Sequence, residues 1–203
     1  SWGATLALVY GISHPAQVTH LVLRGVFLMT AGELNWFYGG GAGTFWPEVW
    51  NRFVSIIPED ERSDLIGAYS RRLFSGDPPI ETRFARAWAS WENTLASINY
   101  DVPVGDSPAD LGRAFARLEI HYLLNSGFLE HDGWIEANLD QLSGVPGTIV
   151  QGRYDMICPP AAAYRLHNAW PKSRLKIVPR AGHALSEAGI SAELVRTMDA
   201  LRR

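Results

Sequence analysis

The sequence has one cysteine, Cys158, among its 203 residues. A single cysteine cannot form an internal disulfide, and it cannot build a cysteine-based zinc site. No apolar run approaches the roughly 20 residues that a membrane-spanning helix needs. An excess of one charge is also lacking, because the chain has 21 acidic and 18 basic residues and neither kind forms a long block. The sequence therefore lacks the basic footprint typical of nucleic-acid-binding proteins, and neither a nucleic-acid nor a membrane partner is expected.

Apolar and aromatic residues, by contrast, are plentiful. The chain is 47% hydrophobic and 11% aromatic, with 8 tryptophans, which excludes a disordered or low-complexity protein. Its length suits one large domain or one domain with an insertion. Position 1 is Ser1, and an apolar helical pattern begins at once, so we expect that an upstream part of the protein is absent. Any targeting segment would lie there, and the expectation of a cytoplasmic protein rests on the single cysteine alone.

Both ends of the chain alternate between strand and helix patterns. Small and apolar residues recur at helical spacing over residues 3–12, until His14-Pro15 ends the pattern. The β-branched runs predict strands over residues 18–23, 147–151 and 174–178, and helices are predicted over 159–170 and 190–201. Strands that alternate with helices at this spacing indicate a parallel sheet with crossover helices, which makes the fold class α/β.

The middle of the chain carries helical patterns and no convincing strand series. Helices are predicted from Pro58 to about residue 74, over 80–98 and over 110–124, with a polar loop at 99–108. The glycines at 39–43 form a loop that no Lys-Ser or Lys-Thr pair follows, which excludes a phosphate loop. We therefore expect an α/β core at residues 1–32 and 143–203, interrupted by a helical cap at 33–142.

Three residues at the ends of predicted elements suggest nucleophilic catalysis. Ser1-Trp2-Gly3 before a helix matches the second half of the G-x-S-x-G turn, in which the N–H of Trp2 would stabilise an oxyanion. Asp155 and His183 each follow a predicted strand, and active sites of α/β sheets lie at those strand ends. In this scheme His183 takes the proton of the Ser1 hydroxyl and Asp155 orients the imidazole. The alternatives are an ordinary serine, a turn aspartate and a loop histidine.

Two acidic residues lie on apolar stripes of the predicted cap helices. Glu92 lies on the stripe formed by Phe84, Trp88, Trp91 and Leu95, and Glu119 on the stripe formed by Phe115, Leu118 and Tyr122. Burial of an unpaired carboxylate costs several kcal/mol, so both positions need a cation. A protonated substrate amine is one candidate, and the other is internal pairing with Arg83, Arg86, Arg113 or Arg117.

Aromatic residues near these positions suggest a small apolar pocket. Phe27 follows the first predicted strand, and Phe37 lies in the cluster Trp36-Phe37-Tyr38. The alternative for each ring is core packing. Arg24 could pair with a site carboxylate or, as we favour, with a structural acid. Cys158 is expected to pack near the site without acting as a nucleophile, because no strand-turn-helix presents it.

Several long segments resemble prolyl aminopeptidases, also called proline iminopeptidases, of the α/β-hydrolase fold. They are SWGATLALVYGISHPAQVTHLVLRGVF, LNWFYGGGAGTFWPEVW, RAWASWE, FARLEIHYLLNSGF and the ending GRYDMICPPAAAYRLHNAWP with AGH. The resemblance covers nearly the whole chain in unbroken order. It implies the C-terminal part of an α/β-hydrolase with a helical cap, acting as a serine peptidase that releases N-terminal proline from peptides. No cofactor or metal is implied.

The resemblance also implies a role for each candidate site residue. The family's triad maps onto Ser1, Asp155 and His183, its amine-binding cap acids onto Glu92 and Glu119, and its aromatic contacts onto Phe27 and Phe37. Two departures matter. The family often has Tyr where this chain has Phe37, and its upstream strands and His-Gly-Gly-Pro-Gly loop are missing. We therefore expect residues 1–203 alone to be inactive. The alternative function is an α/β-hydrolase esterase or amidase of other specificity.

Overall fold

The computed structural model describes residues 1–98 and 109–202, so the polar loop predicted at 99–108 lies outside the described residues. The described chain divides into two compact units. Of the described residues, the first unit holds 1–33, 96–98 and 131–202, and the second holds 34–95 and 109–130. The division at residues 32 and 142 drawn from the sequence stays a prediction. No helix among the described residues has the length and apolar character to cross a bilayer.

A parallel sheet forms the centre of the first unit. Its strands β1, β2 and β3 span Leu21–Arg24, Gly147–Gly152 and Ser173–Val178. They are hydrogen bonded in the order β1-β2-β3, with Leu21 beside Gly147 and Gly147 beside Ser173. Every residue of β2 is buried, as expected of a central parallel strand. The predicted parallel sheet is therefore confirmed, although β1 begins three residues later than the pattern at 18–23 suggested.

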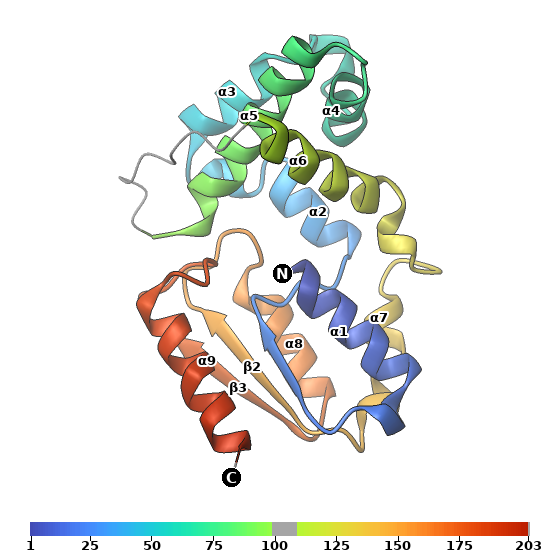
Figure 1. Ribbon diagram of the computed structural model, residues 1–203, viewed down its shortest axis with the longest axis vertical. Helices are drawn as coiled ribbons and strands as arrows, with labels where there is room; N and C mark the ends of the chain where they lie inside the picture. Colours follow the sequence, from blue (N-terminus) through green and yellow to red (C-terminus); the bar gives the residue numbers. More distant parts are fainter. Residues whose placement is uncertain (99–108, 203) are drawn as a thin grey trace. The chain divides into compact units, whose positions relative to one another are not determined.

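Helices cover both faces of this sheet (Figure 1). Helix α9, Ala188–Leu201, packs Ile190 and Leu194 against Val178 of β3. On the other face, the first helix brings Gly11 against Leu21 of β1. The remaining helical segments of this unit are α1 (Trp2–Ser13), α7 (Trp134–Ala137), α8 (Pro160–Ala169) and the 3₁₀ turns Pro15–Gln17 and Leu139–Leu142. The helices predicted at 3–12, 159–170 and 190–201 are thus present.

The second unit is helical throughout its described residues. Its segments are most of α2 (Ala31–Tyr38), α3 (Pro47–Ser55), α4 (Leu65–Leu73), α5 (Pro78–Ala96) except its last residue, α6 (Ala109–Leu124) and the 3₁₀ turns Ala42–Thr44, Glu59–Glu61 and Ser126–Phe128. An aromatic cluster fills its core. Phe53 stacks on Tyr69 with ring centroids 4.5 Å apart, and Tyr38 stacks on Trp88 at 4.6 Å. Such stacked rings add to the stability that burial of their area provides.

One predicted helix of the second unit is wrong, and two of its helices were missed. The helix expected from Pro58 to residue 74 is interrupted, because Asp64 leaves the helical conformation and its carboxylate accepts the Gly67 N–H at 2.9 Å as the N-cap of α4. Helices α2 and α3 were not predicted. Helix α5 begins at Pro78 and ends at Ala96, two residues before each predicted bound.

Of the two apolar stripes predicted on the long cap helices, the structure buries one and exposes the other. Phe84, Trp88, Trp91 and Leu95 are buried along α5, which confirms that stripe. On α6 the prediction is wrong, because Phe115 and Leu118 are 47% and 61% exposed. The buried face of α6 instead carries Ala116, Ile120 and Leu123. Both faces of this helix hold apolar residues, so hydrophobic periodicity alone could not select the buried one.

Candidate active site

Ser1 lies where the predicted nucleophile should be, directly before α1. Its backbone N donates to the carbonyl oxygen of Arg24 at 2.6 Å, which brings it to the carboxyl end of β1. The Ser1 hydroxyl does not cap the helix. Trp2 is the first helical residue, and backbone N–H groups in that first turn point out of the helix end. The helix terminus at Ser1 therefore suits a developing negative charge.

Asp155 is a buried carboxylate with hydrogen bonds to both oxygens. Its Oδ1 accepts the backbone N–H groups of Ile157 and Cys158 at 3.1 and 2.8 Å. Its Oδ2 accepts from the Gln151 side-chain amide at 2.9 Å and from Nδ1 of His183 at 2.8 Å. These donors fix the carboxylate in place and satisfy its charge.

His183 is also buried, in the loop after β3. Its backbone N–H and that of Ala184 both donate to the carbonyl oxygen of Ala96, at 2.8 and 2.7 Å. Burial is the largest cause that lowers the pKa of His183 below its ordinary value, and the hydrogen bond to Asp155 opposes it. The imidazole is therefore neutral near pH 7, as a general base must be.

Arg24 occupies the second ring nitrogen of His183. Its Nη1 lies 2.9 Å from Nε2 and 3.0 Å from the carbonyl oxygen of the same histidine. A guanidinium can only donate, so Nε2 accepts and the ring proton lies on Nδ1, facing Asp155. This is the tautomer that a base acting through Nε2 requires. Our preference for a pairing of Arg24 with a structural acid is therefore wrong.

The structure brings the three predicted triad residues into one region but does not join all of them. Asp155 and His183 are hydrogen bonded. Ser1 lies beside Arg24, which in turn contacts His183. Among the described residues, no hydrogen bond joins Ser1 to His183, because Nε2 accepts from Arg24 instead. Proton transfer from Ser1 would therefore require that Arg24 leave Nε2.

Two buried polar residues near this region were missed from the sequence. Gln151 is fully buried at the end of β2 and also accepts the Val26 N–H at 3.0 Å. Glu33 binds the loop after β1, where its carboxylate accepts the N–H groups of Leu28 and Thr30. A polar residue directly after the apolar pair Ile149 and Val150 of a predicted strand was the available signal for Gln151. No comparable pattern marked Glu33.

The two predicted cap acids meet each other in the second unit. A side-chain hydrogen bond links Glu92 to Glu119. Burial is the main cause that raises the pKa of each carboxyl, and the charge of Glu119 raises that of Glu92 further. Oε2 of Glu92 is buried without a hydrogen-bond partner among the described residues. The alternative, internal pairing with an arginine, is not seen for Arg117, which binds Glu81 instead.

The two predicted ring-binding residues differ in exposure. Phe27 is half-buried, and its carbonyl oxygen accepts the hydroxyl of Thr5 at 2.7 Å. Phe37 is buried beside Tyr38, with ring centroids 4.4 Å apart. Cys158 is buried beside Asp155, as expected, and burial raises the pKa of its thiol well above the ordinary value.

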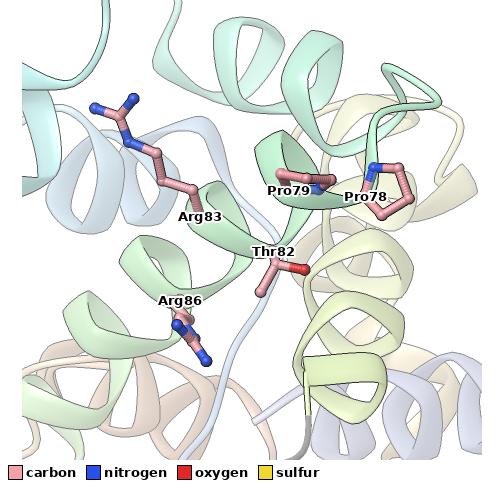
Figure 2. Close-up of a pocket in the computed structure, with 5 residues that line it drawn as sticks. All are labelled: Pro78, Pro79, Thr82, Arg83 and Arg86. Atoms are coloured by element: carbon pink, nitrogen blue, oxygen red, sulfur yellow. The ribbon is translucent and has the colours of Figure 1, made fainter.

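A separate hollow opens at the start of α5. Five residues of α5 line it, namely Pro78, Pro79, Thr82, Arg83 and Arg86. Figure 2 shows the side chains of Arg83 and Arg86 extending outward from this helix. None of the predicted site residues lines this hollow. Within residues 1–98 and 109–202, no group of three or more histidine, cysteine or acidic side chains is arranged to hold a metal.

The chain belongs to the α/β-hydrolase fold family, whose model matches residues 1–189. Among curated proteins, it is 48% identical over 198 residues to a proline iminopeptidase of Arabidopsis thaliana, covering 96% of this chain and 52% of that protein. It is 44% identical to a probable proline iminopeptidase of Leptolyngbya boryana, covering 98% of this chain and 63% of that protein. The chain thus spans between about half and two thirds of the length of these relatives.

The solved structures bear on the fold alone. An esterase from Exiguobacterium antarcticum is similar with a TM-score of 0.54 and 17% identity, covering 99% of this chain and 63% of that one. This likeness agrees with the predicted α/β-hydrolase fold.

Proposed function

We propose that the protein containing this chain is a proline iminopeptidase, a serine exopeptidase that releases N-terminal proline from peptides. The half-buried acid pair Glu92 and Glu119 carries the proposal of specificity, because the two carboxyls have no cationic partner among the described contacts. A free N-terminal amine would supply that cation. The similarity to named proline iminopeptidases supports the same substrate. We also propose a cytoplasmic protein, on the single cysteine alone.

The proposed reaction follows from the roles of three side chains. Once Arg24 has left Nε2 of His183, the Ser1 hydroxyl attacks the prolyl carbonyl carbon while Nε2 takes its proton, and the Trp2 N–H donates to the resulting oxyanion. The tetrahedral intermediate then breaks the C–N bond, and His183 returns the proton to the leaving amine. Water hydrolyses the prolyl ester by the same route. Asp155 holds the Nδ1–H tautomer throughout.

The proposed binding site combines charge with shape. Glu92 and Glu119 bind the protonated amine of the substrate, and the rings of Phe27 and Phe37 contact the pyrrolidine. A substrate without a free amine would gain nothing from the acid pair. The selectivity for a free N-terminus therefore distinguishes this proposal from an esterase or amidase of other specificity.

The test is hydrolysis of L-proline β-naphthylamide and its N-acetyl analogue by the protein at its full natural length. We expect cleavage of the free amine only, and a loss of about 10⁴-fold or more in Ser1→Ala. Glu92→Ala and Glu119→Gln should each lower kcat/KM for the free amine about 10- to 100-fold, with little effect on simple esters. Equal losses on both substrate types would remove the amine-binding role.

A matched control is Glu59→Gln. Glu59 lies in the same unit, but its side chain is 90% exposed and pairs loosely with Arg62 at 3.6 Å. Because exposed pairs contribute little, this variant should retain the kinetics of the unmodified protein. Efficient cleavage of the N-acetyl analogue by the unmodified protein would instead favour the esterase or amidase alternative.

A further inference from the structure

Trp88 has an unusual hydrogen-bond partner for a buried tryptophan. Its side chain is 1% exposed on α5, and its indole Nε1 donates to Oε2 of Glu119 at 2.6 Å. Trp91, one turn later and equally buried, donates to the backbone carbonyl oxygen of Phe37 at 3.1 Å. An indole N–H can only donate, and a carboxylate is the stronger acceptor when it is ionised. Trp88 therefore favours the charged form of Glu119.

Glu92 lacks such a donor. It lies four residues after Trp88 on the same helix, and its Oε2 is buried with no partner among the described residues. A buried carboxylate oxygen without a donor pays the full desolvation penalty when it is charged. The hydrogen bond between Glu92 and Glu119 also needs a proton, because two carboxylates repel and neither can donate. The shared proton therefore belongs to Glu92.

The charged groups on the neighbouring helices are paired elsewhere. Arg72 of α4 binds Glu61, and Arg117 of α6 binds Glu81 and the carbonyl oxygen of Leu73. Arg113 donates to the hydroxyl of Thr82, and Arg83 lies 5.7 Å from the Phe84 ring centroid. Within the described residues, the causes that act on the pKa values of the two carboxyls are burial, each other and the Trp88 donor. The Trp88 bond lowers the pKa of Glu119, and no such bond acts on Glu92.

We propose that Trp88 is a positioning residue whose indole N–H makes Glu119 the ionised member, and leaves Glu92 the protonated member, of an acid pair that shares one proton. The pair then carries one negative charge, equal and opposite to the charge of one ammonium group. A pyrrolidinium has two N–H donors, and the pair offers the Glu119 carboxylate and the carbonyl oxygen of Glu92 as acceptors. The binding of a substrate ammonium group by this pair rests on the proposed function. The location of the shared proton on Glu92 does not.

The first experiment needs no substrate. The side-chain carboxyls of the glutamates are labelled with ¹³C and titrated by NMR in the unmodified protein, in Trp88→Phe and in Trp91→Phe. Trp91→Phe is a matched control, because it removes an equally buried indole N–H from the same helix. We expect the midpoint of Glu119 to rise in Trp88→Phe and to stay unchanged in Trp91→Phe. An unchanged Glu119 midpoint in Trp88→Phe would overturn the proposal.

A second measurement decides the question if Trp88→Phe does not fold. The ¹⁵N–¹H resonance of the Trp88 indole in the unmodified protein should shift with pH as Glu119 ionises. The Trp91 indole resonance should not follow that midpoint, and the shift should vanish in Glu119→Gln. A Trp88 resonance that does not follow the ionisation of Glu119 contradicts the proposal.

The catalytic consequence is tested by comparing L-proline β-naphthylamide with cyclopentanecarboxylic acid β-naphthylamide, whose ring has the same size but no nitrogen. The ratio of the two kcat/KM values should fall about tenfold in Trp88→Phe, as expected for the loss of a hydrogen bond to a charged group. It should stay constant in Trp91→Phe. A constant ratio in Trp88→Phe would contradict the positioning role. If the unmodified protein cleaves neither compound, the proposed function fails, and the NMR titration still decides the state of the proton.

Discussion

Gln151 and His183 donate to the same carboxylate oxygen of Asp155, at 2.9 and 2.8 Å. The Gln151 amide also donates to the carbonyl oxygen of Cys158 and accepts the N–H of Val26. One fully buried side chain thus connects the end of β1 to the carboxylate that orients the imidazole. These bonds hold the Asp155 carboxylate in place beside His183.

We predict that Gln151→Leu lowers kcat/KM about 10-fold or more, because it removes a hydrogen bond to a charged group and leaves the Val26 N–H without a partner. The free energy of unfolding should also fall, by about 1–3 kcal/mol. Steady-state kinetics and urea denaturation measure both effects. The control is Gln141→Leu on the exposed Gln141, which should change neither. Kinetics of Gln151→Leu that match the unmodified protein would show that Asp155 does not depend on this bond.

Gly25 leaves the space that the His183 ring fills. A Cβ added to Gly25 would lie 2.7 Å from Cε1 and 2.9 Å from Nδ1 of that ring, and the backbone there has φ +58°. We predict that Gly25→Ala displaces the imidazole and lowers kcat/KM about 100-fold, in line with the cost of a misplaced catalytic group. Kinetics and the His183 NMR signals measure this.

Gly76→Ala separates the two reasons for that loss. Gly76 also has positive φ, +78°, but an added Cβ would meet nothing within 4 Å. It should therefore show only the backbone strain of about 1 kcal/mol, without an effect on catalysis. Equal kinetic losses in the two variants would attribute the effect to strain and not to the contact with His183.

Arg24 is one of the causes that lower the pKa of His183, after burial. Because a neutral imidazole is required as base, activity should fall as the pH drops through a value below 6.5. We predict that Arg24→Met raises the pKa of His183, so the acidic limb of the kcat/KM profile moves to higher pH. The ¹⁵N shifts of the ring report the same pKa without substrate.

Arg153→Met is the control for this shift, since Arg153 is exposed in the loop after β2 and is not among the charges that act on His183. Its profile should match that of the unmodified protein. If the limb stays in place in Arg24→Met, the contact between Arg24 and Nε2 does not control the titration.

Cys158 should react slowly with thiol reagents in the folded protein. It is 2% exposed, and burial raises the pKa of its thiol, so little thiolate is present near neutral pH. We predict slow alkylation by iodoacetamide in native buffer and an ordinary rate in urea, measured by mass spectrometry. Alkylation at the same rate in both conditions would show that the thiol is accessible in the fold.

Part of the fold could be predicted because its signals are local. The β-branched runs at β2 and β3 are buried strands, and a parallel sheet places their carboxyl ends together. That argument located Asp155 and His183 in neighbouring loops, and the structure joins them by a hydrogen bond.

Other features depend on contacts between distant segments. Arg24 and His183 are separated by 159 residues, so their contact left no pattern in the sequence. The buried face of α6 was chosen wrongly because both faces carry apolar residues. The break before α4 depends on the side chain of Asp64, whose capping bond competes with continuation of the helix.

Phe37 is both a proposed contact for the proline ring and a supporting part of the cap interior. Its carbonyl oxygen accepts the Trp91 indole, its ring stacks on Trp91 at 6.1 Å, and it is only 7% exposed. An attempt to widen the acceptance of N-terminal residues by trimming this ring would therefore also weaken the scaffold. Substitutions that aim to alter specificity should therefore begin at Phe27, which is less deeply buried, and leave Phe37 unchanged.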